Sequence, residues 1–286
     1  MHTKLAIGTV QFGLDYGISN TLGKVSLDEI DKIFDYAISK NVSCIDTAQA
    51  YGDSEAVLGL FTEKYPLVII TKLKADIGSG DNIISAFNSS LSKLKVKFIY
   101  GLLYHDFQSF LNNTGSFEII KNLKKEGAVK KIGFSLYHPQ ELEYLLENKI
   151  EFDLIQIPYS IFDRRFEPYF ETLNQIGVEI HVRSVFLQGI IFMEQNKLSD
   201  FFTDFKTKLD LFHAKCDKLQ VSSGHAALQF VAANRFIDKI VLGIQSLEHL
   251  KINMDWLGRG LGTDNNYFDE LKEENLDFII PSNWKL

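Results

Sequence analysis

The 286-residue sequence has little cysteine and no long hydrophobic run. Its two cysteines, Cys44 and Cys216, form no motif, which excludes a disulfide framework and predicts reduced thiols in an intracellular protein. No apolar stretch reaches the roughly 18 residues that a membrane span needs. The first residues also lack the apolar core of a signal peptide. These absences predict a cytoplasmic protein with no membrane partner.

An excess of positive charge is also lacking. The formal net charge is −7, which argues against a broad basic surface for nucleic acid. The histidines other than His105 show no metal-ligand spacing, so we expect no bound metal. The content of 45% hydrophobic and 23% charged residues is ordinary for a globular protein. The chain is therefore long and apolar enough to bury a sizeable core.

Strand-like and helix-like patterns alternate along the whole chain. The runs expected to form strands are residues 5–10, the segment around 45, 67–72, 98–105, 129–136, 154–157, 178–185 and 240–244. Repeated β-α units imply parallel strands with right-handed crossovers. Eight such units predict a closed (β/α)8 TIM barrel, with residues 1–286 forming one α/β domain. We expect a two-helix insertion before the last strand, and a C-terminal tail that packs on the barrel or covers its mouth.

Two helices near the N-terminus have residues typical of helix N-termini. Residues 26–40 have apolar side chains on one face. Ser26 and Glu29 have the spacing of a capping box, in which each side chain accepts a hydrogen bond from the other's backbone N–H. A second helix is expected at residues 54–64, with Asp53 as its N-cap.

Four polar residues lie at or just after the ends of early strands: Asp46, Tyr51, Lys72 and His105. Each has a structural interpretation on its own, as a turn cap or a surfacing side chain. Together they would meet at the mouth of the barrel, where (β/α)8-barrel enzymes have their active sites. There, the Lys72 ammonium would lower the pKa of the Tyr51 phenol, ordinarily near 10. Asp46 would keep Lys72 charged, and His105 would orient a substrate oxygen.

The order and surroundings of these four residues resemble the catalytic tetrad of the aldo/keto reductases. The matching words are Ile-Asp-Thr-Ala at 45–48, Tyr-Gly at 51–52, Ile-Thr-Lys at 70–72 and Leu-Leu-Tyr-His at 102–105. Segments 130–135, 154–159 and 241–253 resemble later parts of the same family. The resemblance implies a (β/α)8 barrel that binds an extended nicotinamide cofactor, usually NADPH, without a Rossmann fold. No G-x-G-x-x-G follows a strand, which agrees with that implication.

The resemblance also implies a set of cofactor contacts. The residues concerned are Ser135, Gln156, Arg183, Gln188, Gly189, Gly243, Gln245, Ser246, His249 and Asn253. Ser135 and Gln156 are expected at the nicotinamide carboxamide, and Gln188 and Gly189 near the pyrophosphate. The members between 243 and 253 are expected around the adenosine phosphate and the adenine.

Three positions depart from the family pattern. Leu136 replaces a common Asn, and Arg183 stands where many members have a Tyr that stacks on the nicotinamide. His249 stands where many NADPH-dependent members place an Arg that pairs with the 2′-phosphate. Because neutral imidazole is a weaker phosphate partner than guanidinium, NADH is the alternative to NADPH.

For the substrate, the candidate mouth residues are Phe12, Tyr16, Tyr137 and Arg164. If Arg164, Arg165 and Arg183 all face the mouth, they would suit an anionic substrate such as a phosphorylated or nucleotide-linked sugar. The opening segment at residues 8–20 resembles bacterial family members associated with surface-carbohydrate biosynthesis.

These observations predict an NAD(P)H-dependent oxidoreductase that reduces a small-molecule aldehyde or ketone, with Tyr51 as general acid. Three alternatives stay open. One is a non-catalytic barrel that binds cofactor and regulates a partner. Another is a sugar aldolase or isomerase that uses Lys72 for a Schiff base. The third is a redox-neutral epimerisation with retained cofactor. The sequence sets neither the oligomeric state nor the physiological substrate.

Overall fold

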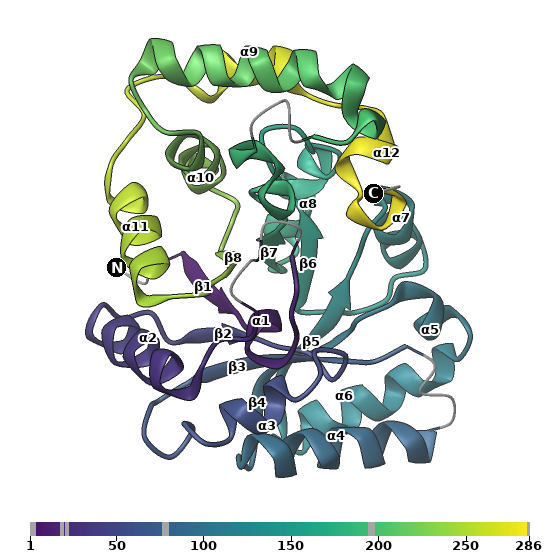
Figure 1. Cartoon of the computed structure of the whole chain (residues 1–286). Helices are drawn as coiled ribbons and strands as arrows, with labels where there is room; N and C mark the ends of the chain where they lie inside the picture. The colour runs from purple at the N-terminus through teal and green to yellow at the C-terminus, as the bar shows by residue number, and fades with distance from the viewer. Residues whose placement is uncertain (1–3, 18–19, 21–22, 76–79, 194–197, 285–286) are drawn as a thin grey trace.

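A ring of parallel strands organises the chain (Figure 1). The structure is a computed structural model that describes residues 4–17, 20, 23–75, 80–193 and 198–284. The strands are β1 (Leu5–Gly8), β2 (Cys44–Asp46), β3 (Val68–Leu73), β4 (Ile99–Tyr104), β5 (Val129–Ser135), β6 (Leu154–Pro158), β7 (Glu179–Arg183) and β8 (Lys239–Gly243). Each strand pairs in parallel with the next, and β8 pairs with β1 to close the barrel. The predicted (β/α)8 barrel is confirmed.

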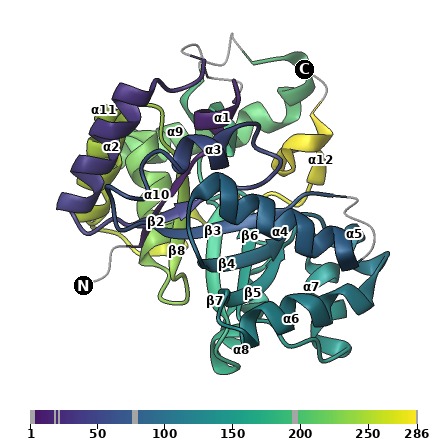
Figure 2. The same ribbon diagram turned by 90° about the horizontal axis from the view of Figure 1, so that it is seen from below.

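Helices follow the strands and cover the outside of the ring (Figures 1 and 2). They are α1 (Val10–Gly13), α2 (Leu27–Ser39), α3 (Ser54–Leu58), α4 (Gly80–Leu94), α5 (Phe107–Leu111), α6 (Phe117–Lys125), α7 (Pro139–Glu147), α8 (Phe170–Gln175), α9 (Thr203–Leu219), α10 (Ser223–Ala233), α11 (Leu247–Gly258) and α12 (Leu276–Ile279). The predicted two-helix insertion is α9 and α10, which lie between β7 and β8 in the chain. No described helix combines the length and apolar character needed to cross a membrane.

The end of α3 and the start of α2 differ from the sequence expectation. Helix α3 ends at Leu58 instead of 64 because Gly59, a poor helix former, packs directly on the backbone carbonyl of Lys93. At α2, the Ser26 hydroxyl accepts from the Glu29 N–H as predicted, at 3.3 Å. The Glu29 carboxylate, however, accepts from the backbone N–H of Leu247 in α11, at 2.7 Å. Only half of the predicted capping box forms.

Apolar side chains fill the inside of the barrel below its mouth. This inner cluster consists of Ala6, Cys44, Ile70, Leu103 and Leu154. Side chains two residues apart in a strand point to the same face. The inner face therefore continues upward through the residues at positions 46, 72, 105 and 156, which are polar. Because side chains alternate between the two faces of each strand, the inside of the barrel has an apolar layer with one polar layer above it, toward the mouth.

The C-terminal tail, yellow in Figure 1, runs along α9. The ring of Phe278 stacks on Phe205 of α9, with centroids 5.5 Å apart. Trp284 packs edge-on against Phe202 at 5.3 Å. The tail therefore packs on the helical insertion, which is one of its two predicted placements.

Candidate active site

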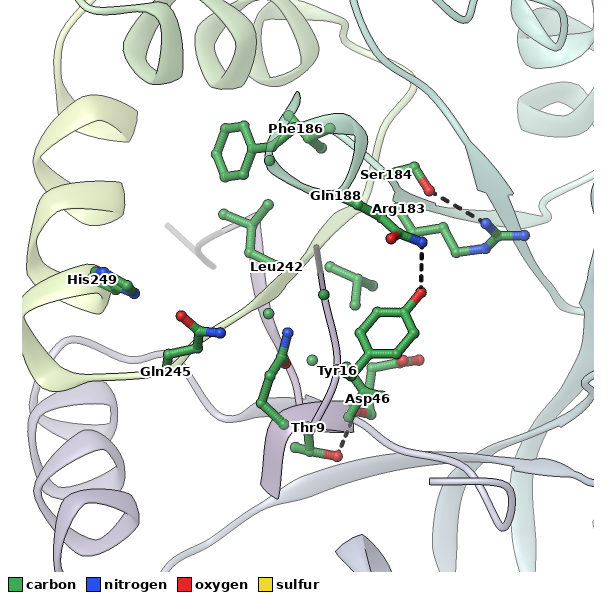
Figure 3. A pocket seen from close by; sticks show the side chains of 18 of the residues that line it. Thr9, Tyr16, Asp46, Arg183, Ser184, Phe186, Gln188, Leu242, Gln245 and His249 are labelled. Carbon is green, nitrogen blue, oxygen red and sulfur yellow. Dashed lines mark hydrogen bonds between the residues drawn. The ribbon is translucent and has the colours of Figure 1, made fainter. Parts of the chain in front are cut away.

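A cavity of about 610 Å³ opens at the carboxyl ends of the strands (Figure 3). Its size lies in the range of small-molecule and cofactor sites. The predicted site residues that line it are Tyr16, Asp46, Tyr51, His105, Tyr137, Gln156, Arg183, Gln188, Gly189, Gly243, Gln245, His249 and Asn253. The cavity runs from the polar layer of the barrel to α11.

A buried ion pair lies beneath the floor of the cavity, and its Asp46 member lines that floor. Lys72 Nζ lies 2.6 Å from Asp46 Oδ1, and the two side chains are 0% and 3% exposed. Lys72 also donates to the backbone carbonyl of Thr47 at 2.9 Å. The second Asp46 oxygen accepts from Gln156 Nε2 at 2.7 Å. Because β2 lies beside β3, the barrel brings the acid and the base together, and every oxygen of the carboxylate has a partner.

Tyr51 and His105 lie directly above this pair. Lys72 Nζ stands 5.1 Å from the centre of the Tyr51 ring. The rings of Tyr51 and His105 meet edge to face, with centroids 5.6 Å apart. The structure therefore brings together all four residues of the predicted tetrad.

The surroundings shift three of these pKa values. Burial raises the pKa of the Tyr51 phenol, and nearby Asp46 adds to the rise while Arg183 opposes it. Burial lowers the pKa of Lys72 against the opposing pull of Asp46. Burial, with Lys72 and Arg183, lowers the pKa of His105 to about 3. His105 is therefore a neutral hydrogen-bonding group near pH 7. The sequence-based expectation of a lowered Tyr51 pKa differs from this result because burial outweighs the nearby cations.

The loop after β7 forms one wall of the cavity in an unusual backbone conformation. Ser184, Leu187 and Gln188 have φ values of 65°, 43° and 50°, and Gly189 has 95°. Non-glycine residues in this region cost about 1–3 kcal/mol each, so such conformations persist where the surrounding structure holds them. Gln188 Nε2 donates to the Tyr16 hydroxyl at 3.0 Å across the cavity (Figure 3). The loop is thereby tied to the segment after β1.

The far end of the cavity is built from β8 and α11. Gln245 and His249 enter it from this side, opposite Arg183 and Asp46 (Figure 3). A Cβ at Gly243 would lie 2.9 Å from the Gln11 amide, so a larger residue there would require the Gln11 side chain to shift. Gln11 Oε1 is buried and has no hydrogen-bond partner among the described residues. An extended cavity with an unfilled acceptor, polar ends and apolar walls fits a nicotinamide dinucleotide.

Several predicted residues lie elsewhere. Phe12 is buried in the core against Phe34, with ring centroids 5.9 Å apart, so its expected place at the mouth is wrong. Ser135 is buried beside Gln156 in the strand register but does not line the cavity. Ser246 is the N-cap of α11, where its hydroxyl accepts from the His249 N–H at 3.1 Å.

Fewer arginines face the cavity than the sequence predicted. Arg164 is buried, and it donates to Asp269 at 2.7 Å and to the Phe268 carbonyl at 2.6 Å. Arg165 donates to both oxygens of Asp163 at 2.8 Å. Arg164 thus anchors the C-terminal tail and does not face the mouth. Of the three arginines, only Arg183 lines the cavity.

The residues that line the cavity and were not predicted from the sequence include Gln11, Phe192 and Trp256. Gln11 follows the end of β1, and a polar residue just after a strand could have been predicted to face the barrel mouth. The other two depend on how the β7 loop and α11 pack, which no local pattern shows. Among the described residues, no group of His, Cys, Asp and Glu side chains is placed to hold a metal ion.

Comparisons with known proteins agree with this geometry. Residues 4–270 match the model of the Aldo/keto reductase family. The chain is 24% identical to Oxidoreductase sirO of Leptosphaeria maculans over 90% of this chain and 89% of that protein. It is 23% identical to the uncharacterized oxidoreductase YqkF of Bacillus subtilis over 78% and 80% of the two chains.

A solved structure has the same fold. The holo form of aldo-keto reductase AKR11C1 from Bacillus halodurans superposes with a TM-score of 0.77, at 20% identity, over 94% of this chain and 92% of that one. Members of the family use NAD(P)H and act on small-molecule carbonyl compounds. With a family match over nearly its whole length, the chain belongs to the aldo/keto reductase family of oxidoreductases.

Proposed function

We propose that this protein reduces an aldehyde or a ketone to an alcohol, with Tyr51 as the proton donor. The observation that carries the proposal is the Tyr51 phenol above the buried Lys72–Asp46 pair, beside neutral His105, on one wall of the cavity. Bound NAD(P)H would supply the hydride to the carbonyl carbon. Gln11 and the residues of the far end, Gln245 and Asn253, would hold the remainder of the dinucleotide.

The protein's own residues then handle the proton. The raised pKa of Tyr51 keeps its phenol protonated near pH 7. An alkoxide is a stronger base than a phenolate, so the phenolic proton moves to the carbonyl oxygen as negative charge develops there. The Lys72 ammonium offsets the charge left on the Tyr51 oxygen, and Asp46 holds that ammonium in place. His105, a neutral donor, orients the carbonyl oxygen.

The Schiff-base alternative has less support. Lys72 Nζ is fully buried, donates to Asp46 and Thr47, and is not part of the cavity wall. An amine that attacks a carbonyl must be neutral and accessible to it. These contacts favour Lys72 as a fixed cation instead.

For the substrate, we propose a carbonyl compound that carries an anionic group, such as a phosphorylated or nucleotide-linked keto sugar. Support comes from Arg183, whose guanidinium stacks on Tyr137 at 4.1 Å inside the cavity. Among the described residues, no carboxylate forms an ion pair with it. A link to surface-carbohydrate biosynthesis rests on the resemblance of the opening segment alone.

The test is turnover with a probe substrate. We would mix the protein with para-nitrobenzaldehyde and either NADH or NADPH, and follow the loss of absorbance of the reduced cofactor. We expect Tyr51→Phe to slow turnover by about 10²- to 10⁴-fold, the usual contribution of general acid catalysis. Tyr137→Phe, which removes a second hydroxyl from the same cavity, is the matched control and should keep most activity. Equal losses in the two variants would remove the special role of Tyr51. Dinucleotide binding without turnover of any carbonyl compound would favour the regulatory barrel.

A further inference from the structure

The two ends of the cavity have different tasks if the proposed function holds, and this inference rests on it. Hydride transfer beside Tyr51 would require the nicotinamide to lie at the polar layer of the barrel. The cavity then extends from that layer to α11. The adenosine end of an extended dinucleotide would therefore reach the first turns of α11, where Gln245 and His249 line the wall (Figure 3), as does Asn253.

A carboxylate already occupies the start of α11. Helices α2 and α11 lie side by side (Figures 1 and 2). Glu29 of α2 accepts a hydrogen bond from the Leu247 N–H, the first residue of α11, at 2.7 Å. The next capped donor, the His249 N–H, is bonded to the Ser246 hydroxyl at 3.1 Å. The free N–H groups and partial positive charge that attract a phosphate to a helix start are thus offset by a carboxylate.

The side chains at this end of the cavity do not restore the positive charge that Glu29 offsets at the start of α11. The part of the wall formed by described residues of β8 and α11 contains no lysine or arginine, and His249 is its one titratable side chain. Glu248 adds a second acid to the first turn of α11. Lys32 lies 3.3 Å from Glu29 but is 62% exposed, and Lys251 lies over the Tyr36 ring at 5.8 Å. Neither Glu29 nor Glu248 lines the cavity itself, but both contact or belong to the turn of α11 that carries His249, so a phosphate here would lie near two carboxylates and one imidazole.

We propose that this protein binds NADH in preference to NADPH, and that the Glu29 carboxylate at the start of α11 sets the preference. NADPH differs from NADH by a phosphate on the adenosine ribose, which carries nearly two negative charges at neutral pH. NADH has a neutral hydroxyl at that position, which a nearby carboxylate does not repel. Carboxylates commonly mark NAD sites and arginines mark NADP sites in other dinucleotide folds. This proposal differs from the sequence-based expectation, in which the resemblance to the family favoured NADPH.

Direct binding tests this inference without any need for turnover. Each dinucleotide would be titrated into the purified protein while protein fluorescence is followed, because Trp256 lines the cavity. We expect NADH to bind the wild-type protein at least about tenfold more tightly than NADPH, or about 1.4 kcal/mol. The ratio should shrink as the salt concentration rises, because a charge penalty near the surface is screened.

Two variants probe the cause. Glu29→Gln keeps an oxygen that can accept from Leu247 but removes the charge, so NADPH affinity should rise severalfold while NADH affinity does not. His249→Arg should also favour NADPH, and it leaves the α2–α11 contact intact if the first variant is unstable. Asp28→Asn is the matched control, since it removes an exposed charge from the same turn of α2 and should leave the ratio unchanged.

The outcomes separate the inference from the proposed function. Wild-type protein that binds NADPH as tightly as NADH, or more tightly, overturns the preference while the reductase proposal stands. Equal effects of Glu29→Gln and Asp28→Asn overturn the specific role of Glu29. A folded protein that binds neither dinucleotide overturns the proposed function, and the inference falls with it.

Discussion

Removing the Lys72 ammonium should damage stability as well as catalysis. Lys72→Met leaves Asp46 buried without its ion-pair partner, whose Nζ now lies 2.6 Å away. Breaking a buried pair by removing one member costs about 3–5 kcal/mol, because the remaining charge stays desolvated. Asp46 would keep the hydrogen bond from Gln156 at 2.7 Å, so we expect the lower end, about 3 kcal/mol.

A double-mutant cycle separates this penalty from ordinary loss of packing. Asp46→Asn in the Lys72→Met background removes the stranded charge, and its amide still fits the space. The double variant should therefore be more stable than the sum of the two single changes predicts, by about 2 kcal/mol. Lys74→Met is the control, because Lys74 is exposed and its change should stay within about 0.5 kcal/mol.

The assay is urea unfolding followed by fluorescence, with reversibility checked by dilution. A shift of the midpoint at constant m-value reports stability alone. Additive effects of the two substitutions, or a loss from Lys72→Met no larger than from Lys74→Met, would refute the buried ion pair as an element of the fold.

The other predictions concern single residues. Arg164→Met should lower the unfolding free energy by about 2–4 kcal/mol, because bonds from a buried charged group to the tail are lost, while KM for para-nitrobenzaldehyde stays unchanged. His105→Asn should flatten the acid side of the stability profile between pH 6.5 and about 3, measured by urea midpoints. In that window the unfolded chain binds a proton at His105 that the folded chain does not, so stability falls as pH falls, by at most about 1.4 kcal/mol per pH unit. Arg183→Gln should cut kcat/KM for para-carboxybenzaldehyde by about tenfold relative to benzaldehyde, since a charge-assisted hydrogen bond is lost.

Each of these predictions has a contrary result. A change in KM with unchanged stability in Arg164→Met would return that residue to the substrate site. Exposed Arg235, which stacks on Phe236 at 4.7 Å, is its control and should cost below about 1 kcal/mol when replaced by Met. If the stability of His105→Asn depended on pH in the same way as that of the wild type, His105 would not be neutral in the folded protein. Equal losses for both aldehydes in Arg183→Gln would remove the anion argument.

The barrel and its polar layer were predictable because both follow from local patterns. Eight apolar runs separated by helices imply parallel strands, and parallel strands end at one edge. The period of two along each strand then places Asp46 and Lys72 on the inner face. The electrostatic balance of this layer was not predictable from the sequence, because the burial that raises the pKa of Tyr51 is a property of the packed barrel mouth.

What the sequence did not show depends on contacts between distant segments. Arg164 was expected at the mouth, yet its partner Asp269 lies 105 residues further along the chain. Glu29 has the spacing to cap its own helix, but its carboxylate instead accepts a hydrogen bond from a backbone N–H 218 residues away. Local rules describe what a side chain can do, whereas the tertiary packing decides which of its options is used.

The most direct test of the account follows the hydride itself. The protein would be incubated with para-nitrobenzaldehyde and reduced nicotinamide cofactor that carries deuterium at its transferable position, and the products examined by proton NMR. We predict para-nitrobenzyl alcohol with one deuterium on the carbinol carbon, formed far more slowly by Tyr51→Phe. Alcohol without the label, or an aldehyde adduct on Lys72 trapped by borohydride, would contradict hydride transfer as the protein's chemistry.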